Sequence, residues 1–153
     1  MGKLLETIKR FFQEDGWDYT ESTMDTGLLL RFGSRNEQWN CYARVREQYG
    51  QLMFYSYAPV DIPEPKRLSI AEYITRVNFG LHIGDFEMNF STGTVQFKTG
   101  IDVKGQEENL TFTMIKHLVY TNVVTMDKFL PGLRMIISEN MTPDQAITRI
   151  EAD

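Results

Sequence analysis

Few side chains in this sequence could act as nucleophiles, proton carriers or metal ligands. There is one cysteine, Cys41, and there are two histidines, His82 and His117, which stand far apart in the chain. Metal sites are usually recognised from ligands at short, regular spacings, so we predict no metal site here. Cys41 alternates with Trp39 and Ala43 on the apolar side of a predicted strand. A thiol buried there has a raised pKa and is unreactive, so we expect Cys41 to serve core packing.

Acid–base and phosphate chemistry have equally little support. Asp85 and Glu87 would lie on one side of a strand, about 7 Å apart along it, a spacing that a glycosidase could use. Alternating charges on a solvated sheet face are far commoner. The glycines form neither GxGxxG nor GxxxxGK[ST], so no phosphate-binding loop is predicted. We therefore predict no catalytic residues, no cofactor and no enzymatic activity, unless the fold places His82 or His117 beside Asp85, Glu87 or Cys41.

One sheet face carries the residue types that protein interfaces favour. Tyrosine and arginine are enriched at interfaces and their energetic hot spots, and arginine recognises carboxylates through two parallel hydrogen bonds. If the predicted strands have the expected phase, six such side chains point away from the helix-covered side. The alternative is an ordinary solvated sheet face with cross-strand pairs. The candidate protein-binding residues are Arg31, Tyr42, Arg44, Arg46, Tyr55 and Tyr57.

A long predicted helix after Thr111 is apolar around most of its circumference. Its inner stripe runs from Ile115 to Leu130, and the apolar side chains outside that stripe are Met114, Tyr120 and Val124. Such a helix usually packs on two sides. Either the first helix of the chain covers these residues or a second subunit does, and symmetric dimers are the commonest oligomers, so we expect a homodimer.

A small-ligand sensor is the alternative function. It would need a deep apolar pocket with a few convergent polar groups. The sequence places this pocket between the sheet and the long helix, lined by aromatic residues such as Phe97, Tyr120 and Phe129.

The elements that position these residues follow from periodicity and from turn and cap residues. Residues 4–12 have helical spacing, with Gly16 placed to end the helix, and a second helix runs from Pro65 to about Gly80. The segments 28–32, 39–46 and 52–57 are predicted strands, as are 86–90 and 95–103, and a further short strand is placed at 18–22. Pro131–Gly132 predicts a kink or an interruption of the long helix. Thr142 begins a capping box with Gln145 for a last, short helix.

Strands joined by short turns pair antiparallel, so these elements define an α+β fold. We expect an antiparallel sheet of about five to six strands with helices on one face, in the order helix, strands, helix, hairpin, helices. No internal repeat or linker divides the chain, and a length of 153 residues suits a single domain over 1–153.

Composition narrows the class of partner and the compartment. Hydrophobic residues make up 42% of the chain and charged residues 24%, as in ordinary globular proteins. The formal net charge of −5 argues against a general nucleic-acid binder. No apolar run approaches a membrane span, no signal peptide is recognisable, and a single cysteine forms no internal disulfide, so we expect a cytoplasmic protein that binds no membrane.

Several segments resemble the YbjN domain family of bacterial proteins, especially its cyanobacterial members. The resemblance runs nearly end to end, and it is carried by ETIKRFFQEDGW from Glu6, QWNCYARVRE from Gln38, FYSYAPVDIPEPKRLSIAEYITRVNFGLHIGDFEM from Phe54 and IKHLVYTNVVTMDKFLPGL from Ile115. It implies a sensory transduction regulator with a fold like that of type III secretion chaperones, which are small acidic dimers that bind segments of other proteins. The family brings no catalytic motif, so the resemblance implies a protein-binding, chaperone-like or regulatory domain.

Overall fold

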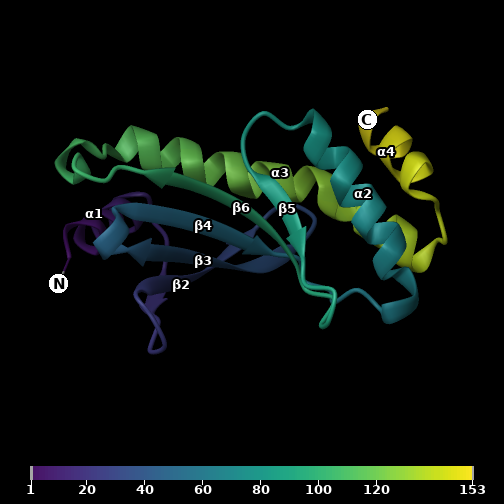
Figure 1. Ribbon diagram of the computed structural model, residues 1–153, viewed down its shortest axis with the longest axis horizontal. Helices are drawn as coiled ribbons and strands as arrows, with labels where there is room; N and C mark the ends of the chain where they lie inside the picture. The colour runs from purple at the N-terminus through teal and green to yellow at the C-terminus, as the bar shows by residue number, and fades with distance from the viewer. Residues whose placement is uncertain (1, 153) are drawn as a thin grey trace.

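Six antiparallel strands form one sheet in the computed structural model of the protein, which describes residues 2–152 (Figure 1). The expected domain, 1–153, includes two terminal residues that lie outside this description. The strand order is β1-β2-β3-β4-β6-β5, so only the β5–β6 hairpin departs from a simple meander. This is the α+β architecture expected from the alternating segments and short turns. The strands are β1 Tyr19–Glu21, β2 Gly27–Gly33, β3 Gln38–Arg46, β4 Gln51–Tyr57, β5 Asp85–Met88 and β6 Val95–Asp102.

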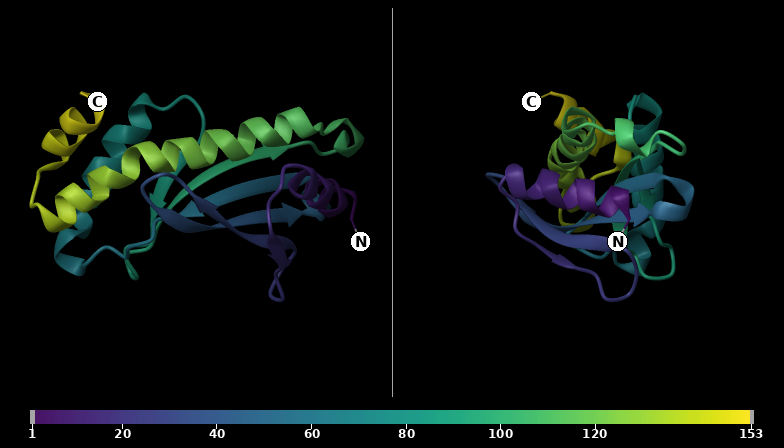
Figure 2. Two further views of the ribbon diagram at one scale, coloured as in Figure 1. Left: turned by 180° about the vertical axis from the view of Figure 1, so that it is seen from behind. Right: turned by 90° about the vertical axis from the view of Figure 1, so that its left-hand side faces the viewer.

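Four α-helices accompany the sheet among residues 2–152: α1 Lys3–Glu14, α2 Arg67–Gly80, α3 Phe112–Ser138 and α4 Pro143–Glu151. α1 and α3 lie over the same face of the sheet, and α2 and α4 pack together beside one end of α3 (Figures 1 and 2). Within residues 2–152, the opposite face of the central strands carries no helix, as the end-on view of Figure 2 shows. This open face is where the predicted binding residues lie.

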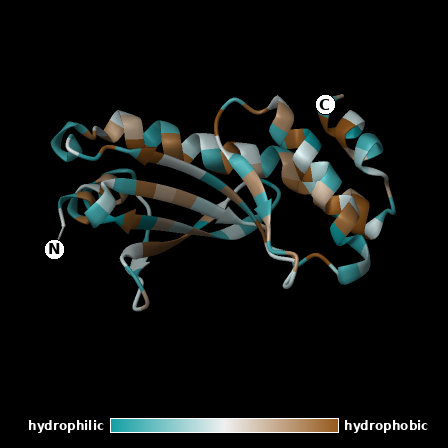
Figure 3. Ribbon diagram, in the orientation of Figure 1, coloured by the Kyte–Doolittle hydropathy of each residue, from teal (hydrophilic) through white to brown (hydrophobic). Residues whose placement is uncertain are grey.

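The core fills the space between the sheet and the helices. Hydrophobic and polar residues alternate along the strands, most clearly on β3 (Figure 3). Trp39, Cys41, Ala43 and Val45 are buried on the helix side, and their neighbours point to the other side. The period of two that predicts a half-buried strand is therefore realised.

The long helix α3 buries the whole stripe predicted for it. Within that stripe Asn122 is fully buried, and its Nδ2 donates to the carbonyl oxygens of Phe54 at 2.8 Å and Phe97 at 3.0 Å. Its Oδ1 has no partner among the described residues. Asn122 thus ties α3 to β4 and β6 at the centre of the sheet.

Two details differ from the sequence-based expectations. Of the kink or interruption expected at Pro131, the interruption is absent: α3 is one helix through Pro131, and Leu130, Leu133 and Ile136 are buried against the rest of the fold on both sides of the proline. In the hairpin, β5 ends at Met88, so Phe90 lies beyond the strand and is half exposed instead of continuing its apolar side.

The predicted helix ends are present. Gly16 has a φ of +81°, and the Thr111 side chain accepts a hydrogen bond from the Met114 backbone N–H. Thr142 and Gln145 form both bonds of the capping box that starts α4. Between residues 2 and 152, no helix has the length and apolar content needed to cross a bilayer.

Candidate functional site

The open face of the sheet presents rows of side chains that cross the strands. In the central row Leu29, Tyr42, Tyr55, Lys98 and Asp85 are successive neighbours on β2, β3, β4, β6 and β5. The structure places all six predicted residues on this face: Arg31, Tyr42, Arg44, Arg46, Tyr55 and Tyr57.

Three tyrosines form a stacked series at the centre of the open face. The Tyr42 and Tyr55 rings have centroids 6.5 Å apart and planes 21° apart, and Tyr55 and Tyr57 are 6.2 Å and 14° apart. Partial burial, together with the neighbouring Tyr55, raises the pKa of Tyr57 and so disfavours ionisation of its hydroxyl. The series offers rigid apolar rings with hydroxyl groups able to donate and accept.

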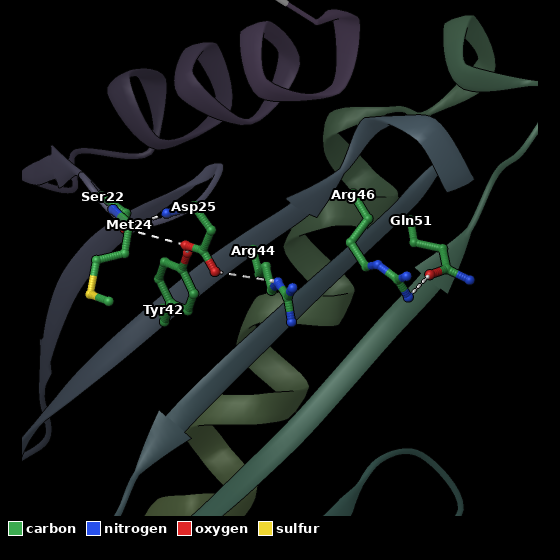
Figure 4. Close-up of polar contacts among 7 residues, drawn as sticks. All are labelled: Ser22, Met24, Asp25, Tyr42, Arg44, Arg46 and Gln51. Carbon is green, nitrogen blue, oxygen red and sulfur yellow. Dashed lines mark hydrogen bonds and ion pairs between the residues drawn. The ribbon is translucent and has the colours of Figure 1, made fainter.

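A carboxylate from the β1–β2 loop sits at one end of the tyrosine series. The Tyr42 hydroxyl donates to Asp25, and the Asp25 carboxylate lies 3.6 Å from Nε of Arg44 (Figure 4). Gly27 on the adjacent strand makes room for this arrangement, because a Cβ there would lie 2.6 Å from the Tyr42 ring. The Tyr42–Arg44 pair therefore already holds one carboxylate, supplied by the chain itself.

Arg46 extends the cationic side of the open face along β3. Its Nη1 donates to Gln51 at 3.1 Å (Figure 4). Its guanidinium carbon lies 4.2 Å from the Tyr49 ring centroid. Gln51 in turn donates to Asp102 at 3.1 Å. Within the described chain no carboxylate lies within ion-pair distance of Arg46. The Tyr49 ring and the hydrogen bond to Gln51 orient the guanidinium of Arg46. Most of its five N–H donors make no hydrogen bond to these neighbours.

A hollow of about 540 Å³ opens beside these arginines. Gly100 has no side chain to fill the space next to Met53, and Ile83, from the α2–β5 loop, forms another wall with 61% of its surface exposed. Arg44, Arg46 and Tyr55 border the hollow on the β3–β4 side. The hollow thus combines apolar surface with cationic groups.

Acidic residues and Lys98 occupy the β6–β5 side of the same hollow. Lys98 pairs with Glu87 at 2.9 Å, and this hydrogen bond raises the pKa of Lys98. Partial burial opposes ionisation of Glu87, but hydrogen bonds from Lys98 and Gln96 outweigh it and lower the pKa of Glu87. Burial and the nearby Glu87 raise the pKa of Asp85. These contacts are those of an ion-paired sheet face, and Asp85 and Glu87 have distinct surroundings.

The residues considered for catalysis are dispersed. Cys41 is 1% exposed, and burial raises the pKa of its thiol to about 12. His82 and His117 are exposed, on the loop after α2 and on α3. No hydrogen bond or ion pair within residues 2–152 joins either histidine to Cys41, Asp85 or Glu87, and the same residues hold no cluster of potential metal ligands.

Other parts of the same chain cover two of the three apolar side chains that lie outside the inner stripe of α3. Tyr120 donates to Asp15 at 2.6 Å and its ring packs against Trp17, while Met114 is half-buried. The segment that follows α1 is therefore the cover for Tyr120, and Val124 stays 63% exposed.

Packed side chains fill the region around Phe97 where a ligand pocket was predicted between the sheet and α3. The Phe97 ring is fully buried, with its centroid 4.7 Å from that of Phe86. Phe129 instead borders a groove of about 300 Å³ between α2, α3 and α4, which Tyr120 and Phe97 do not line.

Sequence reasoning missed four residues of the open face: Asp25, Met53, Ile83 and Gly100. Asp25 and Ile83 lie in loops, where no periodicity assigns a direction to a side chain. The alternation along β4 does place Met53 on the outer face, and the phase of β6 does the same for Gly100. Pattern alone could therefore have identified Met53 and Gly100 but not Asp25 and Ile83.

Comparison with known proteins agrees with this architecture. A sequence profile of the YbjN family, described as "Putative bacterial sensory transduction regulator", matches residues 4–135. The chain therefore belongs to the YbjN family. The fold is also similar to the crystal structure of YbjN from E. coli, described as a putative transcription regulator, with a TM-score of 0.63 and 11% identity over 86% of this chain and 90% of that one. No curated protein matches the sequence.

Proposed function

We propose that the protein is a non-enzymatic regulatory domain that binds another protein through the open face of its sheet. The observation that carries the proposal is the surface formed by the stacked tyrosines and the adjoining arginines, Arg44 and Arg46. The family description as a sensory transduction regulator supports a regulatory role. A regulator of this kind acts by occupying a surface, so it needs no catalytic cluster.

The side chains of the open face are already ordered before a partner binds, and this preorganisation favours binding. Tyr42, Tyr55 and Tyr57 are held in register by their strands and by stacking, so little conformational entropy is lost when a partner covers them. Their rings offer apolar area and their hydroxyls offer hydrogen bonds. Arg44 and Arg46 add charge-assisted hydrogen bonds to carboxylates of a partner. Aromatic and arginine anchors of this type dominate the energetics of many interfaces.

The test is affinity capture from the native cytoplasm, the compartment that the sequence predicts. The tagged wild type is compared with the double variant Arg44→Glu/Tyr55→Ala, which changes two open-face residues that are not fully buried. Arg35→Glu, in the exposed β2–β3 turn, is the matched charge control. Partners bound through the open face are lost from the double variant and retained by the control. Equal recovery by all three proteins would remove the open face from the proposal.

A homodimer is part of the proposal and remains to be measured. Val124 is the member of the predicted dimer helix that its own chain leaves most exposed, whereas Met114 and Tyr120 are half-buried. We expect a dimer that Val124→Glu weakens, measured by light scattering at several protein concentrations. A monomer at every concentration would refute it, and the type III chaperone-like assembly would lose its support.

A second candidate function is small-ligand sensing in the groove between α2, α3 and α4. The groove of about 300 Å³ has apolar walls that include Val77, Leu81 and Phe129. Its polar positions are Arg76, Thr125, Lys128 and Glu151, and Arg76 is also paired with Glu72 and Asp144. Apolar walls with a few polar groups are typical of ligand sites. A thermal-shift screen of amphipathic carboxylates tests this, because a ligand that binds only the native state raises the Tm. Val77→Trp should abolish any such shift.

A further inference from the structure

We infer that the hollow beside Arg46 receives an extended segment of a partner protein in which an acidic residue adjoins an apolar one. This inference rests on the proposed function and specifies the chemistry of the partner. The carboxylate would bind Arg46, and the apolar side chain would enter the space above Gly100, between Met53 and Ile83.

The chain itself shows which chemistry the arginine side of the open face accepts. Asp25 places one carboxylate between the Tyr42 hydroxyl and the Arg44 guanidinium. Arg46 follows two residues later on the same strand and the same face, about 7 Å further along it. Arg44 therefore has an internal carboxylate, whereas Arg46 has none among residues 2–152.

Arg46 is prepared for a carboxylate from outside. The Tyr49 ring lies 4.2 Å from the guanidinium carbon, and Gln51 accepts one of its hydrogen bonds. These contacts fix the plane of the guanidinium while leaving donors for an incoming group. An arginine held in this way loses little freedom on binding, which favours a two-point contact with a carboxylate.

The hollow supplies the apolar half of the site. Its volume of about 540 Å³ lies within the range of about 300–1,000 Å³ typical of ligand pockets. Ile83 is 61% exposed and Met53 is half-buried, so an apolar side chain placed between them removes hydrocarbon from water on both walls. Main-chain atoms of β6 at Gly100 are accessible because no side chain covers them.

Charge on the far wall selects against other partners. Asp85 and Asp102 also line the hollow, and Asp102 already accepts hydrogen bonds from Gln51 and from the Lys104 backbone N–H. A polyanion such as a nucleic acid would meet both carboxylates, whereas a single carboxylate next to an apolar group can bind Arg46 and keep away from them. A cationic segment would be repelled by Arg46, since Arg44 is already paired with Asp25 and Asp102 is held by two hydrogen bonds.

Solution NMR of the uniformly labelled full chain tests the inference with three blocked tetrapeptides. Acetyl-Gly-Leu-Glu-Gly-amide carries both features, acetyl-Gly-Leu-Lys-Gly-amide reverses the charge, and acetyl-Gly-Ser-Glu-Gly-amide removes the apolar group. The backbone amides of Arg46, Ile83 and Gly100 report on the hollow. We expect saturable shifts of these amides with the first peptide and affinities lower by about tenfold for each of the other two, the size of one lost contact of about 1.4 kcal/mol.

Two variants locate the contact. Arg46→Gln, at an exposed position, should weaken the first peptide about tenfold and make it no better than the lysine peptide. Arg35→Gln, in the β2–β3 turn, should leave its affinity unchanged. Equal shifts from all three peptides, stronger binding of the lysine peptide, or equal shifts from inorganic phosphate alone would each overturn the inference.

The outcome separates this inference from the proposed function. If the tetrapeptides leave the hollow unshifted while Arg44→Glu/Tyr55→Ala still loses its captured partners, the acidic–apolar specificity is wrong and open-face binding stands. If the first peptide shifts the hollow as expected but capture is unchanged by the double variant, the hollow binds peptides and the proposed function fails.

Discussion

Replacing Gly132 with alanine should destabilise the protein, although the same change in most helices is stabilising. Gly132 lies inside α3 and faces Tyr73 of α2. A Cβ built at Gly132 would lie 2.0 Å from the Tyr73 hydroxyl oxygen and 2.4 Å from its Cζ. Tyr73 is fully buried, and its hydroxyl donates to the Phe129 carbonyl at 2.8 Å. The ring must therefore move, and the hydrogen bond is lost with it.

Three contributions determine the expected change in the free energy of unfolding of Gly132→Ala. Loss of the buried Tyr73–Phe129 hydrogen bond costs about 1 kcal/mol. Displacement of a close-packed ring adds about 1–3 kcal/mol. The higher helix propensity of alanine stabilises the folded state by about 1 kcal/mol and so offsets part of this loss. We expect Gly132→Ala to lower the free energy of unfolding by about 1–3 kcal/mol.

Urea denaturation followed by circular dichroism measures this change. Tyr73→Phe alone should cost about 1 kcal/mol, because only the hydroxyl is removed. Gly132→Ala should cost less in the Tyr73→Phe background than in the wild type, since the nearest clashing atom is gone. Unchanged or increased stability of Gly132→Ala would show that α2 does not lie against α3 as described.

Four further predictions concern buried and charged groups. Cys41, with its pKa raised to about 12 by burial, should react with a thiol reagent at pH 8 only after denaturation, and rapid labelling of the native protein would contradict its position. Asp85→Asn should raise the Tm at neutral pH, because ionised Asp85 is disfavoured in the folded state, and this gain should vanish as the pH falls below its ordinary pKa of 3.8. Glu87→Gln should lower the Tm at neutral pH, and this loss should fade as the pH falls below its ordinary pKa of 4.5, so melting curves of both variants across this pH range check the two signs. Asn122→Ala removes the buried amide that donates to two sheet carbonyls and should cost about 2–3 kcal/mol in urea denaturation, with a change under about 0.5 kcal/mol counting against the tie between α3 and the sheet.

Local patterns were enough to predict most of the fold. The alternation from Trp39 to Arg46 assigned each side chain of β3 to a face, because the pleat of a strand has a fixed period. Thr142 and Gln145 marked the start of α4 through a cap that depends only on neighbouring residues. These features depend on chain-local physics, which the sequence displays directly.

Contacts between distant segments could not be predicted in the same way. Nothing in the spacing of residues shows that Tyr120 meets Asp15 and Trp17, or that Asp25 reaches Arg44. Local rules at Pro131 predicted a kink or a break, and the break is absent because tertiary packing keeps α3 continuous. The candidate surface was therefore predictable from strand phase, whereas its hollow and its internal carboxylate depended on the three-dimensional arrangement.

In-cell photo-crosslinking measures most directly which surface binds a partner. A photoreactive phenylalanine analogue replaces Tyr57 on the open face in one protein and Phe79 in another. Phe79 is 95% exposed at the end of α2, outside the strands that form the open face, and serves as the control position. The account predicts discrete crosslinked adducts from position 57 that Arg44→Glu suppresses, and none from position 79 with the same partner. Adducts from position 79 alone, or from neither position, would contradict binding through the open face.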